Sequence, residues 1–240
     1  MIASHFDTAA VSIASSSPVS LAPAKYDSPA VFFVNKKDAS QSQIYNIVTS
    51  DPAGNQEDRY LTNLFSRYLG GGMSSLLFQE IREFRSMAYS TSAYFDKPYY
   101  NSRATVPTVL VSYVGTQSDK TIDAMKIVDS LVFCTPMLDG KLDVVKKELV
   151  NSICNQYPDF RALPGYIITD IRSGYTQDPV NMFSEVIPQA DTTALKEIWK
   201  KYVAGKNAVW TIVGNSKKVD MEGLKQFGTV TTYKPKDIIK

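Results

Sequence analysis

The chain has 240 residues, of which 44% are hydrophobic, and this suits one large domain with a sizeable core. Lysine and arginine number 26 and aspartate and glutamate 24, for a net charge of +2. That balance excludes the charge bias expected of a nucleic-acid-binding protein or of a cationic membrane-surface helix. No apolar stretch approaches the roughly 20 residues that span a bilayer, so no membrane span is expected.

The first part of the chain differs in composition from the rest. Residues 1–28 are rich in Ser, Ala and Pro and nearly uncharged, which predicts a linker or N-terminal arm. This stretch has no basic region followed by a continuous apolar run, so a signal peptide is not expected. Residues 29–240 contain no second linker and no internal repeat, and we expect them to form one domain.

Two strands and a helix are predicted first. Ala30–Asn35 is a short apolar run, and Ser42–Thr49 follows it after a polar turn. The next apolar side chains recur at helical spacing, at Tyr60, Leu61, Leu64, Phe65, Tyr68 and Leu69. Gly70 stands where a left-handed C-terminal cap of this helix belongs.

A second helix is predicted after Ser74 or Ser75, followed by strands at Tyr89–Phe95 and Thr108–Val114. The side chains of this helix expected to point inward are Leu77, Ile81 and Phe84. The remaining predicted elements are helices marked by Ile122 to Val132 and by Leu142 to Cys154, a helix from about Phe160 toward Tyr175, a helix capped by Thr192 or Thr193, and strands at Ala208–Val213 and Thr229–Tyr233.

The order of these elements predicts the fold class. Long helices cluster between pairs of strands instead of alternating singly with them. This favours an α+β domain in which helices cover one face of a mostly antiparallel sheet. A doubly wound parallel sheet is the less favoured alternative.

Histidine and cysteine restrict the possible chemistry. His5 is the only histidine, so neither H-x-x-E-H nor H-E-x-x-H can occur, and a Ser-His-Asp triad would depend on His5. Cys134 and Cys154 fit no metal-binding spacing and fall on apolar helical positions, which predicts buried free thiols. No metal site and no catalytic residue is therefore expected in this chain.

A glycine run, Gly70-Gly71-Gly72, allows three interpretations. It can form a helix cap and tight turn that lets two helices pack closely, or a flexible functional loop. Phosphate binding is the least favoured, because no lysine follows the glycines and the run follows a helix instead of a strand.

The stretch Leu69–Ser90, LGGGMSSLLFQEIREFRSMAYS, resembles the pitrilysin family of zinc peptidases. Lys37–Ser42, Tyr113–Lys120 and Ala208–Gly214 support the resemblance, which covers about residues 29–240. It implies a two-layer α+β domain of the metallohydrolase type with a sheet of about six strands. It also implies a closed chamber built from four such domains, of which one holds zinc on an H-x-x-E-H helix.

Because this chain has no such motif, it resembles a non-catalytic, C-terminal-type wall domain. The zinc would belong to a partner catalytic half, fused upstream or carried by a separate subunit, and the substrate would be an unfolded peptide. The family also uses an Arg and a Tyr, seven residues apart after the glycine run, to contact substrate, and here Arg82 and Tyr89 have that spacing. Ser86 stands where many relatives have Gly.

Three alternatives stay open at this stage. Arg82 could instead form a surface ion pair with Glu83 or another carboxylate. The whole domain could be a structural core-type subunit or scaffold, as in relatives that have lost peptidase activity. It could also be a free module that binds peptides along a sheet edge.

Overall fold

The fold is described by a computed structural model that covers residues 23–52, 56–96, 106–155, 158–172 and 174–238. Most of the expected N-terminal arm, residues 1–22, lies outside these ranges, as does His5. In chain order the elements are β1 (Ala30–Asn35), β2 (Gln41–Ser50), α1 (Gln56–Gly70), the π-helix η2 (Phe78–Glu83), β3 (Ala88–Phe95), β4 (Thr108–Gln117), the 3₁₀ turn η4 (Ser118–Lys120), α2 (Thr121–Phe133), α3 (Asp139–Cys154), α4 (Leu163–Arg172), α5 (Pro179–Gln189), α6 (Thr192–Tyr202), β5 (Ala208–Gly214), η5 (Gly223–Phe227), β6 (Thr229–Tyr233) and α7 (Pro235–Ile238).

The six strands form one sheet in the order β3-β4-β2-β5-β1-β6. The pairs β3/β4, β4/β2 and β2/β5 are antiparallel, whereas β1 pairs in parallel with both β5 and β6. The expected α+β class is confirmed, but the sheet is mixed rather than mostly antiparallel. The difference arises at β1, because the two strands beside it come from the far end of the chain through crossover connections.

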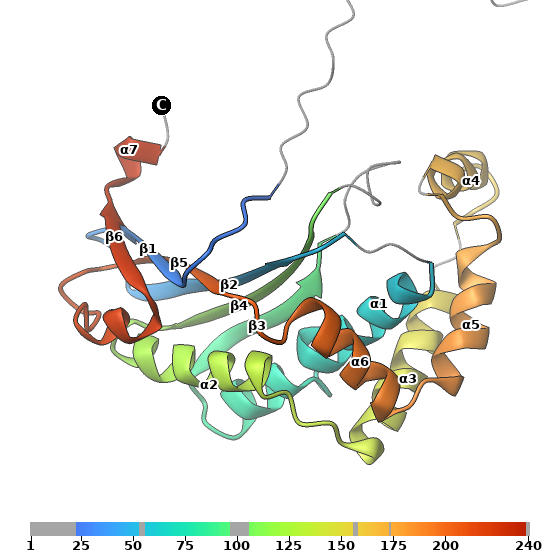
Figure 1. The fold of residues 1–240 in the computed structure, drawn as a ribbon, viewed down its shortest axis with the longest axis horizontal. Helices are drawn as coiled ribbons and strands as arrows, with labels where there is room; N and C mark the ends of the chain where they lie inside the picture. The colour runs from blue at the N-terminus through green and yellow to red at the C-terminus, as the bar shows by residue number, and fades with distance from the viewer. Residues whose placement is uncertain (1–22, 53–55, 97–105, 156–157, 173, 239–240) are drawn as a thin grey trace, which may run out of the picture.

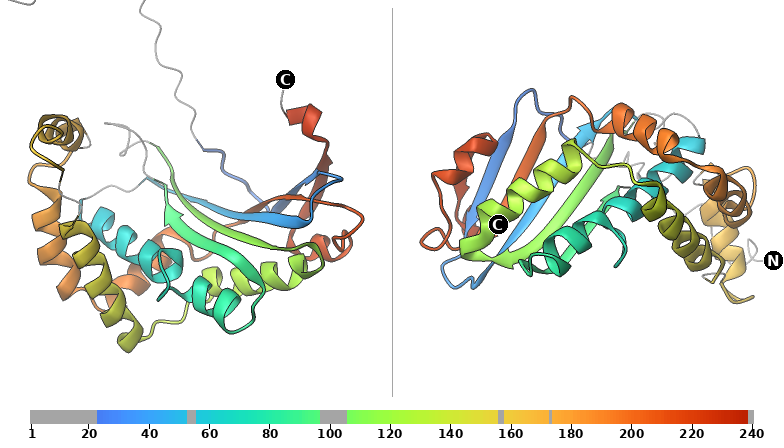
Figure 2. Two further views of the ribbon diagram at one scale, coloured as in Figure 1. Left: turned by 180° about the vertical axis from the view of Figure 1, so that it is seen from behind. Right: turned by 90° about the horizontal axis from the view of Figure 1, so that it is seen from below.

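The helices that contact the sheet all lie on one side of it (Figures 1 and 2). α1 packs on β3, α2 packs on β2 and β4, and α6 packs on β2. Side chains along each strand alternate accordingly. In β4, Leu110 and Val114 face the helices and are fully buried, while Val111 and Tyr113 face the other side and stay partly exposed.

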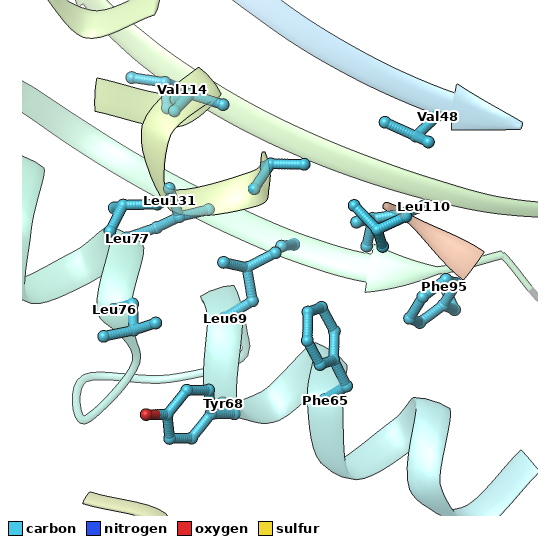
Figure 3. Close-up of a cluster of buried hydrophobic side chains, with 14 of the residues drawn as sticks. Val48, Phe65, Tyr68, Leu69, Leu76, Leu77, Phe95, Leu110, Val114 and Leu131 are labelled. Carbon is cyan, nitrogen blue, oxygen red and sulfur yellow. The ribbon is translucent and has the colours of Figure 1, made fainter. Parts of the chain in front are cut away.

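The hydrophobic core fills the space between this helix layer and the sheet (Figure 3). Phe65 of α1 meets Phe95 of β3 with their ring centroids 5.9 Å apart, and Leu69 and Leu110 lie beside them. Burying an aromatic or leucine side chain of this size stabilises the folded state by about 1.5–3 kcal/mol. The C-terminal half of α1 is therefore fixed firmly against β3 and the strand beside it.

Gly70 closes this contact between α1 and β3. A Cβ atom on Gly70 would lie 2.1 Å from the backbone nitrogen of Ala93 and 2.6 Å from the Ala93 Cβ. Gly70 is the last residue of α1 and has no positive φ, so the expected left-handed cap is wrong. Glycine is required here because helix and strand backbones approach more closely than any side chain allows.

Two helix starts differ from expectation. α5 was not predicted, although Asp178 caps it by accepting a hydrogen bond from the Val180 amide at 2.9 Å and Pro179 occupies its first turn. Asp191 caps α6 by accepting from the Ala194 amide at 2.8 Å. The expected cap was Thr192 or Thr193, and Thr192 instead donates its hydroxyl to Asp139.

Both cysteines are exposed, so the expectation of buried thiols is wrong. Cys134 follows the last residue of α2, and Cys154 is the last residue of α3. A helical position that would be buried in mid-helix becomes accessible where the helix ends.

No helix among the described residues combines the length and the apolar content that crossing a membrane requires.

Candidate functional site

The candidate site lies on the segment that joins α1 to β3, and its first part is the glycine run. A Cβ on Gly71 would lie 2.7 Å from the Arg67 Cα and 2.9 Å from its Cδ, and one on Gly72 would lie 3.3 Å from the Arg67 Cζ. The two glycines therefore leave room for the backbone and side chain of Arg67. Ser75 closes the run, since its hydroxyl donates to the Gly72 carbonyl at 2.6 Å and accepts from the Phe78 amide.

The helix after the glycines positions Arg82. Leu77 and Ile81 are fully buried, as expected, but Phe84 is 70% exposed, so its expected inward orientation is wrong. The reason is that residues 78–83 form a π-helix, in which each residue advances less far around the axis and Phe84 leaves the buried face. Arg82 follows the buried Ile81 and projects outward, with its side chain 48% exposed.

Arg82 and Arg85 have different surroundings. The Arg82 Nε lies 3.9 Å from Glu83 Oε1, and its guanidinium lies 4.8 Å from the centroid of the Phe78 ring. Such an exposed ion pair contributes about 0–1 kcal/mol. Arg85 instead donates to the Glu80 carbonyl at 2.7 Å and forms an ion pair with the Glu80 side chain, which ties it to its own helix.

The turn into β3 has an unusual backbone. Ser86 has a φ of +50°, the only positive φ at a non-glycine residue within the described ranges. A left-handed conformation costs an L-residue about 1–2 kcal/mol. Two hydrogen bonds hold the turn nevertheless, from the Ser86 amide to the Arg82 carbonyl and from the Met87 amide to the Ile81 carbonyl.

Tyr89 lies at a β-bulge in the edge strand β3. Ala88 pairs with Thr116 and Ser90 pairs with Gly115, so Tyr89 is an extra residue with no partner on β4. Bulges at sheet edges bend the strand and re-aim a side chain. The Tyr89 side chain is 72% exposed as a result.

The predicted site residues thus share one continuous segment at one edge of the sheet. Arg82 and Tyr89 are both exposed, but none of the interactions found in the described part of the chain joins them. Within the same residues, no group of three or more His, Cys, Asp or Glu side chains could hold a metal ion.

A cavity of about 560 Å³ beside α1 was not predicted. It is lined by residues of α1, the end of β3, the start of β4, and α3 to α5, among them Arg59 and Arg67. The two arginines are eight residues apart in sequence, so they lie on one face of the helix and are separated by about two turns. That spacing is the signal in the sequence that could have indicated a shared environment.

Comparison with known proteins identifies the family. The family model described as "Peptidase M16 inactive domain" matches residues 2–131, more than half of the chain. An uncharacterized zinc protease of Mycobacterium leprae is 31% identical over 96 residues, which are 40% of this chain and 21% of that protein. One of Rickettsia bellii is 37% identical over 98 residues, or 41% of this chain and 22% of that protein.

A solved structure shares the fold. The peptidase M16 inactive domain from Pseudomonas fluorescens matches with a TM-score of 0.67 at 16% identity, over 82% of this chain and 46% of that one. The aligned part of this chain thus spans about a fifth of the curated relatives and less than half of the solved chain. The match to more than half of its residues shows that this chain belongs to the peptidase M16 inactive domain family, and the resemblance to pitrilysin-type zinc peptidases is confirmed.

Proposed function

We propose that this domain forms part of the substrate chamber of a zinc metalloendopeptidase and contributes peptide contacts to a zinc site held by another domain. Two findings support a zinc site on another domain. The family is described as an inactive domain, and relatives are named zinc proteases. The zinc and its ligands belong to a catalytic partner, whether fused to this chain or separate. The peptide substrate is unfolded when it contacts the chamber wall.

The observation that carries the proposal is the presentation of Arg82 and Tyr89 at the surface by well-fixed backbone. The buried Ile81 anchors the residue before Arg82, and the bulge directs Tyr89 away from the sheet. The contacts of Arg82 with Glu83 and Phe78 are too exposed to explain this placement by stability.

The chemistry of the two groups suits a substrate in an extended conformation. A guanidinium and a phenol both donate hydrogen bonds. They can donate to a peptide carbonyl and to the oxyanion that develops on it during hydrolysis. Donors that strengthen in the transition state raise kcat as well as affinity.

The test is turnover of a peptide by the protease assembled from this domain and its zinc-bearing partner. Arg82→Ala and Tyr89→Phe should each lower kcat/KM by about 10- to 100-fold, in line with the loss of one positioned donor. Arg161→Ala is the matched control, because Arg161 is an exposed arginine stacked on the Phe160 ring, far along the chain.

The competing role is that of a structural core or scaffold subunit. If Arg82→Ala and Tyr89→Phe turn over peptide as fast as the unaltered assembly, the contacts proposed here are absent. Unchanged turnover in both variants would then favour the scaffold role. Thermal melts of each variant check that a lower rate does not come from unfolding.

A further inference from the structure

The cavity beside α1 differs in chemistry from the Arg82–Tyr89 surface and includes neither residue in its lining. Its walls carry two arginines and three tyrosines together with two aspartates: Arg59, Arg67, Tyr94, Tyr166, Tyr175, Asp96 and Asp170. At about 560 Å³ it has the size of a pocket for a small ligand or a few residues of a peptide.

Arg67 lines this cavity, and its hydrogen bonding is incomplete. Its Nε is buried and has no hydrogen-bond partner, and Arg67 forms no ion pair with any carboxylate in the described ranges. Gly71 and Gly72 pack against its side chain, which limits the directions it can take. A buried Nε–H without an acceptor is unfavourable, so this part of the wall favours a ligand that brings a strong acceptor.

Arg59 adds a second positive charge along the same wall. It lies eight residues before Arg67, about 12 Å away along the helix axis. Its guanidinium lies 5.6 Å from the centroid of the Tyr175 ring, a contact that keeps it at the cavity wall. Both cations therefore attract an anion that enters the cavity.

The aspartates of the cavity do not neutralise Arg67. Burial, followed by the charge of Asp178, raises the pKa of the Asp170 carboxyl, and no arginine lowers it. Asp96 is exposed at the end of β3. Their presence disfavours a doubly charged ligand such as phosphate more than a singly charged carboxylate, because repulsion grows with ligand charge.

We propose that this cavity binds a carboxylate group of a peptide, with the Arg67 guanidinium as its anchor and Arg59 as a second attracting charge. The planar fork of an arginine side chain pairs with both oxygens of a carboxylate. The tyrosine rings of the wall contact the adjoining part of the peptide. The carboxylate comes from a peptide C-terminus or from a Glu or Asp side chain. Only the inference that a peptide carries this carboxylate rests on the function proposed above.

The test measures binding to the full 240-residue chain without any zinc-bearing partner. Four probes are titrated: acetyl-Ala-Ala-Ala with a free C-terminus, acetyl-Ala-Glu-Ala-amide, acetyl-Ala-Gln-Ala-amide and inorganic phosphate. The readout is the Nε–H resonance of Arg67 in a nitrogen-15 NMR spectrum, assigned by its loss in Arg67→Gln. A shift with at least one carboxylate peptide, and none with the Gln peptide, is expected, and the responding peptide identifies the source of the carboxylate.

Variants separate this binding from a general charge effect. Variants at Arg67 lack the Arg67 resonance, so peptide affinity is measured by isothermal titration calorimetry. Arg67→Gln should weaken binding of the carboxylate peptide at least 10-fold, and Arg67→Lys should weaken it several-fold, because the charge stays but the fork is lost. Arg161→Gln should leave it unchanged. The proposal is overturned if the Gln peptide binds equally well, if no probe shifts the Arg67 resonance, if phosphate binds more tightly than both carboxylates, or if Arg67→Gln binds like the unaltered chain.

Because no turnover is measured, this result is independent of the chamber role. A chain that binds carboxylate peptides through Arg67 but shows no effect of Arg82 on proteolysis would retain this inference and lose the other. The reverse outcome would retain the chamber role alone.

Discussion

The segment from Gly70 to Phe95 has two parts on which the fold places different demands. Gly70 touches the backbone of Ala93 and Phe95 packs on α1, so packing specifies this part almost atom by atom. Arg82 and Tyr89 between them are exposed, and their own contacts contribute little stability. The comparison teaches that the same short segment combines a rigid support with side chains that remain available for a partner or substrate.

The largest expected effect is at Gly70. Gly70→Ala should lower the free energy of unfolding by more than about 4 kcal/mol or prevent folding, because its Cβ would overlap the Ala93 backbone. Gly140→Ala is the matched control, since nothing lies within 4 Å of the added Cβ and alanine favours the helix. Urea unfolding of both variants tests this prediction. Equal stabilities would show that the contact of Gly70 with Ala93 does not require glycine.

A smaller loss of stability is expected on the buried face of the π-helix than at Gly70, and almost none on its exposed face. Ile81→Ala should cost about 2–5 kcal/mol, as expected for a fully buried side chain. Phe84→Ala should change the free energy of unfolding by less than about 0.5 kcal/mol. If residues 78–84 continued as a regular α-helix, both side chains would face inward, and chemical denaturation would show comparable costs for the two substitutions.

The strained turn before Tyr89 predicts a gain in stability. Ser86→Gly should stabilise the domain by up to about 1 kcal/mol, because removing the left-handed strain outweighs the greater freedom of glycine in the unfolded chain. Ser86→Ala should give no such gain, since alanine keeps the Cβ. A thermal melt in which glycine and alanine behave alike would argue against the positive φ.

The smallest expected effect on stability is at the candidate contact residues. Arg82→Ala and Tyr89→Phe should each change the free energy of unfolding by less than about 0.5 kcal/mol. Differential scanning calorimetry tests this prediction. A large destabilisation would mean that these side chains support the fold, and any loss of turnover would need that explanation first.

Local sequence patterns predict much of this fold. β1 and β6 have the bounds expected for them, and α1 ends one residue after Leu69, the last residue of its apolar stripe. The start of α5 has a local signal as well, because Asp178-Pro179 is an N-cap followed by a first-turn proline. The parallel pairing of β1 could not be predicted locally, because it joins strands from opposite ends of the chain.

Sequence patterns name candidate site residues, but they do not predict how those residues are arranged. The packing role of the glycine run depends on Ala93 and Arg67, which only the folded chain brings beside it. Likewise the π-helix that exposes Phe84 and the bulge that exposes Tyr89 add a residue to a regular pattern, and neither follows from side-chain periodicity. The shared surroundings of Arg59 and Arg67 could not be predicted locally, because their cavity includes residues of five other elements.

The most direct test of the chamber role is photochemical crosslinking in the assembled protease. Benzoylphenylalanine is placed at Tyr89 and, as a control, at Phe160, an equally exposed aromatic on a different part of the domain. The chamber role predicts a crosslink between a bound peptide substrate and residue 89 that unlabelled substrate competes away, and none at residue 160. Absence of a competed crosslink at residue 89, in a protease that cleaves the same peptide, would contradict it.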